Sequence, residues 1–90
     1  MISAELRETL IVAALQALDA AHPQALTPRM LMIPLKQSGL ADLTERDVIS
    51  LIADLEEKGW LKATDSEAAP EVRRYKRTED ARAYLRRNGF

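Results

Sequence analysis

The chain has 90 residues and a formal net charge of −1, and 47% of its residues are hydrophobic. This length suits one small domain, so residues 1–90 are expected to form a single domain. The absence of cysteine excludes disulfides, thiolate metal sites and a thiol nucleophile. No apolar run approaches the roughly 20 residues that span a bilayer, and charged residues interrupt the start, where a signal peptide would be apolar. A soluble, cytoplasmic protein is expected.

The charges are distributed unevenly along the chain. Residues 1–70 hold 6 Lys and Arg against 11 Asp and Glu, whereas residues 71–90 hold 7 against 3. The positive charge is therefore concentrated near the C-terminal end. A local basic patch of this kind is what contact with phosphate groups requires.

The first helix is expected from Ser3, a favoured N-cap residue, to about Ala21. His22-Pro23 closes it, because the residue before proline resists the α conformation. Apolar residues cover an arc of roughly 200°, wider than the ~100° that packing on one core needs. Either this helix is central and covered from two sides, or part of it meets another chain. The arc consists of Leu6, Leu10, Ile11, Ala13, Ala14, Leu15, Ala17, Leu18 and Ala21.

The second helix is expected over Pro28–Ser38. Thr27 supplies a capping hydroxyl before a proline at the first helical position, and Gly39 ends the helix. Pro34 lies inside it and removes one backbone hydrogen bond, so it should kink or tighten the helix. The residues expected to face inward are Met30, Leu31, Ile33 and Leu35 of this helix and either Leu40 or Leu43 of the following turn.

The third helix, expected over Thr44–Lys58, has the clearest local signals. Thr44 and Asp47 have the spacing of a capping box, and Gly59 follows where a left-handed C-cap is needed. The apolar stripe of this helix consists of Val48, Leu51, Ile52 and Leu55.

A β-hairpin and a last helix are expected to complete the chain. Trp60–Thr64 and Val72–Arg77 form the strands, and Asp65–Pro70 forms the tip. Tyr75 lies on the strand face that can pack against the third helix. Thr78 then caps a helix from Glu79 to Arg87.

The residues needed for common enzymatic chemistry are missing. The single histidine, His22, has neither a cysteine nor a second histidine with which to hold a metal or activate a nucleophile. Glu56 and Glu57 are adjacent on a helix, so their carboxylates point about 100° apart and form a solvated face instead of an acid–base pair. The scattered glycines form no phosphate-cradling loop. We therefore expect no enzyme, no cofactor and no metal.

The third helix offers candidate contacts to DNA. Thr44, Arg46 and Ser50 lie on its exposed N-terminal part, where Arg46 could read guanine and Ser50 could contact a phosphate or a base edge. Residues 44–58 nevertheless hold 2 basic against 5 acidic side chains. The alternative is that these charges only keep the helix soluble.

The hairpin offers the stronger electrostatic argument. Strand alternation places Arg74 and Lys76 on one face and Arg73, Tyr75 and Arg77 on the other. One of these faces could therefore straddle a DNA backbone or minor groove beside the third helix. The alternative is an edge strand that charge protects from aggregation.

The chain resembles the winged helix-turn-helix superfamily of small bacterial and phage regulators. Such regulators often have a helix that ends in Leu-Glu-x-x-Gly-Leu-Ile, followed by a wing and a Thr-Glu-x-Gly helix start. The likeness spans roughly residues 4–87, and there is a looser likeness to small winged-helix proteins of Mu-like prophages. Departures are Arg77 in a usually aliphatic place, Ala81 in place of glycine, and the acidic third helix. The resemblance depends on Thr44, Val48, Leu55, Glu56, Lys58, Gly59, Trp60, Leu61, Tyr75, Thr78, Glu79, Ala81 and Leu85.

The sequence thus predicts a mainly helical α+β fold, a winged helix-turn-helix with three helices, a hairpin and a fourth helix. The resemblance implies binding of double-stranded DNA, by a transcriptional regulator that forms a homodimer through the first or last helix. The expected DNA contacts are Thr44, Arg46, Ser50, Arg73, Arg74 and Lys76. The alternative is a winged-helix protein-interaction module without DNA contact, which the wide apolar arc of the first helix and the acidic third helix both favour.

Overall fold

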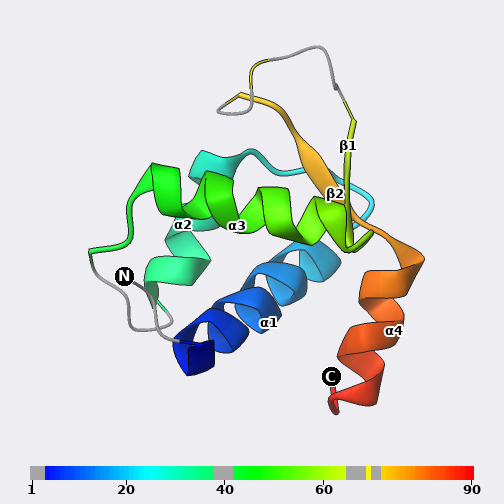
Figure 1. The fold of residues 1–90 in the computed structure, drawn as a ribbon. Helices are drawn as coiled ribbons and strands as arrows, with labels where there is room; N and C mark the ends of the chain where they lie inside the picture. Colours follow the sequence, from blue (N-terminus) through cyan, green and yellow to red (C-terminus); the bar gives the residue numbers. More distant parts are fainter. Residues whose placement is uncertain (1–3, 38–41, 65–68, 70–71) are drawn as a thin grey trace.

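The computed structural model describes residues 4–37, 42–64, 69 and 72–90. Within these residues the chain is mainly helical, with four helices and one small antiparallel sheet in the expected order (Figure 1). The expected cap Ser3, the end of the second helix at Ser38 and Gly39, and most of the hairpin tip lie outside the described residues. The elements are α1 Ala4–Ala21, α2 Pro28–Gln37, α3 Glu45–Glu57, β1 Leu61–Ala63, β2 Tyr75–Arg77 and α4 Glu79–Arg87.

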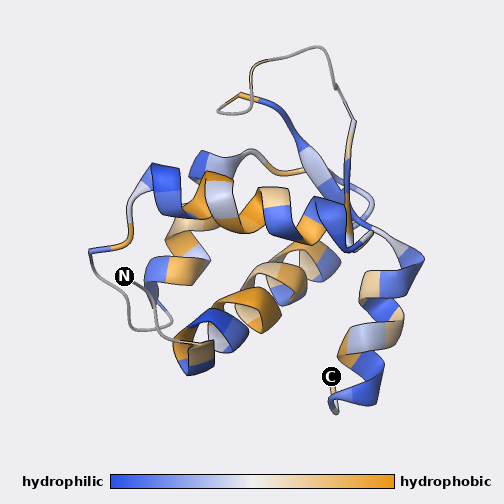
Figure 2. Ribbon diagram, viewed as in Figure 1, coloured by the Kyte–Doolittle hydropathy of each residue, from blue (hydrophilic) through white to orange (hydrophobic). Residues whose placement is uncertain are grey.

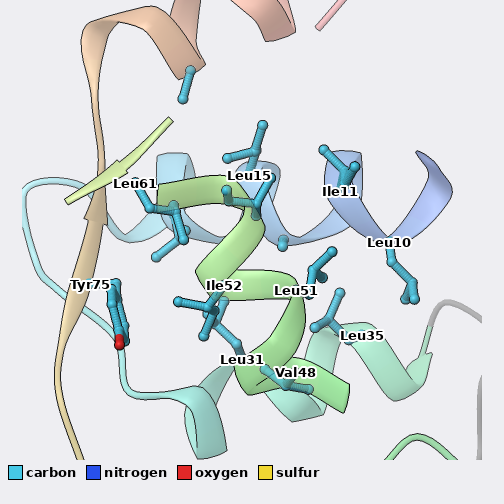
Figure 3. Close-up of a cluster of buried hydrophobic side chains, with 14 of the residues drawn as sticks. Leu10, Ile11, Leu15, Leu31, Leu35, Val48, Leu51, Ile52, Leu61 and Tyr75 are labelled. Carbon is cyan, nitrogen blue, oxygen red and sulfur yellow. The ribbon is translucent and has the colours of Figure 1, made fainter. Parts of the chain in front are cut away.

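Helix α1 lies at the centre of the molecule. It contacts α2, β2 and α4, and this explains why its apolar arc is too wide for a single core contact. The structure therefore shows the central helix, covered from more than one side, of the first sequence-based alternative. Figure 3 shows this helix above α3 in the buried cluster. Its buried residues are Leu10, Ile11, Ala14, Leu15 and Leu18.

Helix α2 packs on α1 and α3 through fewer residues than predicted. Leu31 and Leu35 are buried, but Met30 is 50% exposed and Ile33 is 65% exposed. The prediction that these two residues face inward is wrong, because positions 31 and 35 take the side of the helix that faces α1 and α3. Leu43 of the following turn is buried, as expected of one of the two leucines there.

Local hydrogen bonds fix both ends of α3 as predicted. The Thr44 Oγ1 accepts from the Asp47 N–H (3.2 Å), and Asp47 Oδ2 accepts from the Thr44 N–H (3.0 Å). At the other end Gly59 has φ +79°, and the Trp60 N–H donates to the Leu55 carbonyl (3.0 Å). This is the Schellman arrangement, and it turns the chain directly into β1.

The hairpin is shorter than predicted. Leu61 pairs with Arg77, Lys62 with Lys76 and Ala63 with Tyr75, whereas Val72 lies in a turn. Residues 72–74 therefore do not belong to β2, although the Thr64 N–H donates to the Arg74 carbonyl (2.9 Å) and continues the ladder by one bond. On its other edge β2 exchanges two 2.8 Å hydrogen bonds with Leu26 through Tyr75.

Helix α4 is joined to the corner between α3 and β1. The Thr78 Oγ1 accepts from the Ala81 N–H (3.2 Å), which confirms the predicted cap, and donates to the Gly59 carbonyl (2.7 Å). The rings of Trp60 and Tyr84 stack with centroids 4.2 Å apart. These contacts join α4 to the end of α3.

One buried apolar cluster holds the elements together. Its members come from every helix and both strands, and Tyr75 belongs to it together with Ile52 of α3 (Figure 3). In the described part of the chain no polar or charged residue is buried with them. Nor does that part contain a helix that is long and apolar enough to cross a membrane.

Candidate nucleic-acid interface

The outer side of α3 presents two of the predicted contacts. Arg46 and Ser50 are both exposed and lie four residues apart, on one face of the helix. Thr44 is also exposed, but its hydroxyl accepts the N-capping hydrogen bond from Asp47. Figure 2 shows that the first turn of α3 is hydrophilic. The structure therefore keeps Arg46 and Ser50 available and gives Thr44 a structural role.

Two acidic residues of α3 have partners within the chain. The Asp47 carboxylate accepts from the Thr44 backbone N–H and from the Thr44 side chain, and these hydrogen bonds hold the pKa of that carboxyl below its usual value of 3.8. Asp54 forms an ion pair with Arg7 of α1. Asp47 thus caps α3, and Asp54 joins α3 to α1. Fewer carboxylates of α3 are therefore free to face a ligand than its number of acidic residues suggests.

A hollow connects the first turns of α2 and α3 with the chain that leads into β2. Thr27 and Arg29 line it from α2, Glu45 from α3, and the 59% exposed Val72 from the hairpin side. Thr27, Arg29 and Glu45 are at or within one position of the start of their helices, and Val72 is three positions before β2. Arg29 is exposed and was missed by the sequence reasoning, because the helix on which it lies was interpreted only as a packing element.

The outward face of the hairpin carries a basic cluster. Lys62 and Lys76 are directly opposite each other in the ladder, so their side chains share one face. Residue 74 faces the same way by strand alternation, and Arg74 is exposed. Tyr75 is 2% exposed, which shows that the opposite face is turned to the core. The pairing of the strands reveals Lys62 as a member of this cluster.

Arg73 lies just before β2 and is half-buried. The backbone N–H of Arg73 donates to the Ala69 carbonyl (2.9 Å), so this residue belongs to the turn that precedes β2. Arg73 directly follows Val72 in the chain but is not among the described residues that line the hollow.

Arg77 does not contribute to the basic surface. Its side chain is only 12% exposed, and its Nε lies 2.6 Å from Asp19 Oδ1 of α1. Arg82 Nη1 lies 3.6 Å from the other oxygen of the same carboxylate. Asp19 thus uses two of the C-terminal basic residues to join β2 and α4 to α1.

The described residues contain no group of three or more His, Asp or Glu side chains placed to hold a metal ion. Comparison of the chain with models of protein families, with curated proteins and with solved structures found no match. The interpretation of the site therefore depends on its geometry and charge. That geometry brings the start of α2 with Arg29, the start of α3 with Glu45, and the chain before β2 around one hollow.

Proposed function

We propose that the chain is a winged helix-turn-helix protein that binds double-stranded DNA and acts as a transcriptional regulator. The observation that carries the proposal is the hollow at which the first turns of α2 and α3 meet the chain just before β2. A helix that enters a DNA groove needs a neighbouring helix and a wing close to its N-terminal end, where they can contact the flanking phosphates. In the proposed arrangement α3 is the groove helix and the β1–β2 hairpin is the wing.

The basic face of the hairpin supplies the phosphate contacts in this proposal. Like charges directly opposite each other in an antiparallel ladder destabilise it, so the Lys62–Lys76 pair is unfavourable in the free protein. A phosphate between the two ammonium groups would remove this repulsion. Arg74, on the same face, would extend the contact along the backbone.

In this proposal few side chains of α3 can recognise bases. Arg46 could donate to guanine and Ser50 to a base edge or a phosphate, while Glu45 in the same turn would repel the backbone. We therefore propose that phosphate contacts supply most of the affinity and that sequence discrimination is modest. Association of copies of the chain through α1 or α4 would place several such surfaces on one duplex.

Fluorescence anisotropy with a labelled duplex of random sequence tests this proposal. We expect micromolar binding at low salt whose affinity falls steeply as salt is added, because phosphate contacts release counterions. The double variant Arg74→Ala/Lys76→Ala should bind more weakly and with a shallower dependence on salt. Arg86→Ala/Arg87→Ala, which removes two exposed charges from α4, is the matched control and should behave like the native chain.

Two results would contradict the proposal. Absence of salt-sensitive binding would reject DNA as the ligand. Equal effects of the hairpin variant and the α4 control would reject the hairpin as the contact.

The second candidate function is a winged-helix protein-interaction module without DNA contact. The exposure of Met30 and Ile33 favours it, because these neighbouring apolar side chains on α2 have no role in the core. The same anisotropy titration separates the two functions, since a pure interaction module would not bind the duplex at low salt.

A further inference from the structure

The exposed face of α2 is apolar at its centre and basic at its ends. Met30 and Ile33 are three residues apart on this face, and exposed Arg29 and Lys36 flank them. The helix contains no acidic residue, and neither Arg29 nor Lys36 forms an ion pair with another described residue. We call these four residues the α2 knob.

A groove with the opposite charge lies along the outer side of α1. Val12, Ala13 and the 51% exposed Phe90 give it an apolar lining, and Glu5 and Glu8 stand at its N-terminal end. The Phe90 backbone N–H donates to the Leu85 carbonyl (2.9 Å) across Gly89, which has φ +87°, and this bond holds the main chain of Phe90 at the end of α4. We call this hollow the α1 groove.

The knob and the groove are complementary in polarity and charge. The knob consists of two protruding apolar side chains with cations on either side, whereas the groove is an apolar hollow with carboxylates at one end. Burial of Met30 and Ile33 in the groove would remove apolar surface from water on both sides. It would also place Arg29 or Lys36 against Glu5 and Glu8, which lack ion-pair partners among the described residues.

We propose that the α1 groove is a docking site for the α2 knob of a second copy of this chain. The two surfaces belong to different sides of the fold, since α2 packs on the buried side of α1 and the groove residues occupy the opposite side of that helix. One copy therefore uses its knob on one neighbour and its groove on another. Such a head-to-tail contact continues from copy to copy and does not stop at a symmetric pair.

This inference concerns self-association alone and does not depend on DNA binding. The contact is small and partly electrostatic, so its affinity should be modest and should fall as salt is added. Sedimentation of the full chain at low salt, over about 10 µM to 1 mM, measures it. The weight-average mass should rise with concentration beyond twice the 10.1 kDa of one copy.

Two single-surface variants test the head-to-tail arrangement. Ile33→Glu removes the knob and keeps the groove, and Glu5→Lys/Glu8→Lys reverses the groove's charge and keeps the knob. All three positions are exposed, so both variants should fold. Each alone should associate at least about tenfold more weakly than the native chain. An equimolar mixture should form a 1:1 dimer and nothing larger, because one intact knob then meets one intact groove.

Ala53→Glu is the control, because Ala53 is an exposed apolar residue of α3 that belongs to neither surface. Its association should equal that of the native chain. The proposal is overturned if the native chain stays monomeric throughout, if its mass levels off at a dimer, or if the mixture of variants associates no better than each variant alone. A weight-average mass that levels off at that of a dimer would instead indicate a symmetric contact between two copies.

Discussion

Asp47 shows how one side chain can cap a helix through its charge. Its carboxylate accepts from the Thr44 N–H, and this hydrogen bond places its pKa in the folded chain below 3.8. A pKa that is lower in the folded state contributes stability above the unfolded value and loses it as the pH falls through the folded value. The contribution is therefore complete at neutral pH and disappears under acid conditions.

We expect Asp47→Ala to melt at a lower temperature than the native chain at pH 7. The difference should close as the pH falls below about 3.8, since the native carboxyl then becomes protonated. Thermal unfolding followed by circular dichroism over this pH range measures both effects. Asp42→Ala, an exposed position two residues before Thr44, is the control. A difference that persists unchanged in acid would contradict the electrostatic origin.

The candidate contacts were only partly predictable at the residue scale. Exposure of Arg46 and Ser50 follows from helical periodicity, because the apolar stripe of α3 fixes which side faces the core. Lys62 could not be assigned from its own strand, since its place opposite Lys76 depends on the register of the hairpin. The ion pair of Arg77 with Asp19 joins residues that are far apart in the sequence, so no local sequence pattern predicts it.

At the scale of elements, the signals that determine helix ends are local and were predicted correctly. Thr44, Gly59 and Thr78 act through hydrogen bonds to residues a few positions away. The length of β2 depends instead on where its partner strand ends, and residues 72–74 were assigned to it wrongly. The inward assignment of Met30 and Ile33 failed for a similar reason, since tertiary packing selects the buried side of a short helix.

The repulsion between Lys62 and Lys76 across the ladder should lower the stability of the hairpin. We expect Lys62→Glu to stabilise the chain by about 0.2–1 kcal/mol, because it replaces a repulsion across the ladder by an attraction. The same change should weaken DNA binding, because it removes a cation from the proposed contact. Urea unfolding and the anisotropy titration measure the two effects on one protein.

Arg87→Glu provides the control for this prediction. It changes the net charge by the same amount on α4, where no cross-strand partner is present. A stabilisation of equal size in both variants would show that overall charge, and not the Lys62–Lys76 pair, is responsible. A Lys62→Glu variant that binds DNA as tightly as the native chain would exclude Lys62 from the contact.

At the scale of the whole molecule, α1 connects parts of the chain that are distant in sequence. Its core side supports α2, β2 and α4, while its outer side forms the proposed docking groove. The two sides should therefore differ in their effect on stability. Leu15 is fully buried, and Val12 is half-buried at the groove.

We expect Leu15→Ala to reduce the free energy of unfolding by about 2–5 kcal/mol, since it removes buried methyl groups and leaves a cavity. This is a large part of the roughly 5–15 kcal/mol typical of a small domain. Val12→Ala should cost less than about 1 kcal/mol. Urea unfolding, followed by far-ultraviolet circular dichroism and by the fluorescence of Trp60, measures both variants.

The two probes report different regions, because circular dichroism follows all the helices whereas Trp60 lies between β1 and Tyr84 of α4. If α1 couples these regions, Leu15→Ala should shift both curves to the same lower midpoint. Separate midpoints for the two probes would show that the hairpin and α4 unfold independently of the other helices. Equal losses for Leu15→Ala and Val12→Ala would contradict the division of α1 into a core side and an outer side, and with it the assignment of the groove as a free surface.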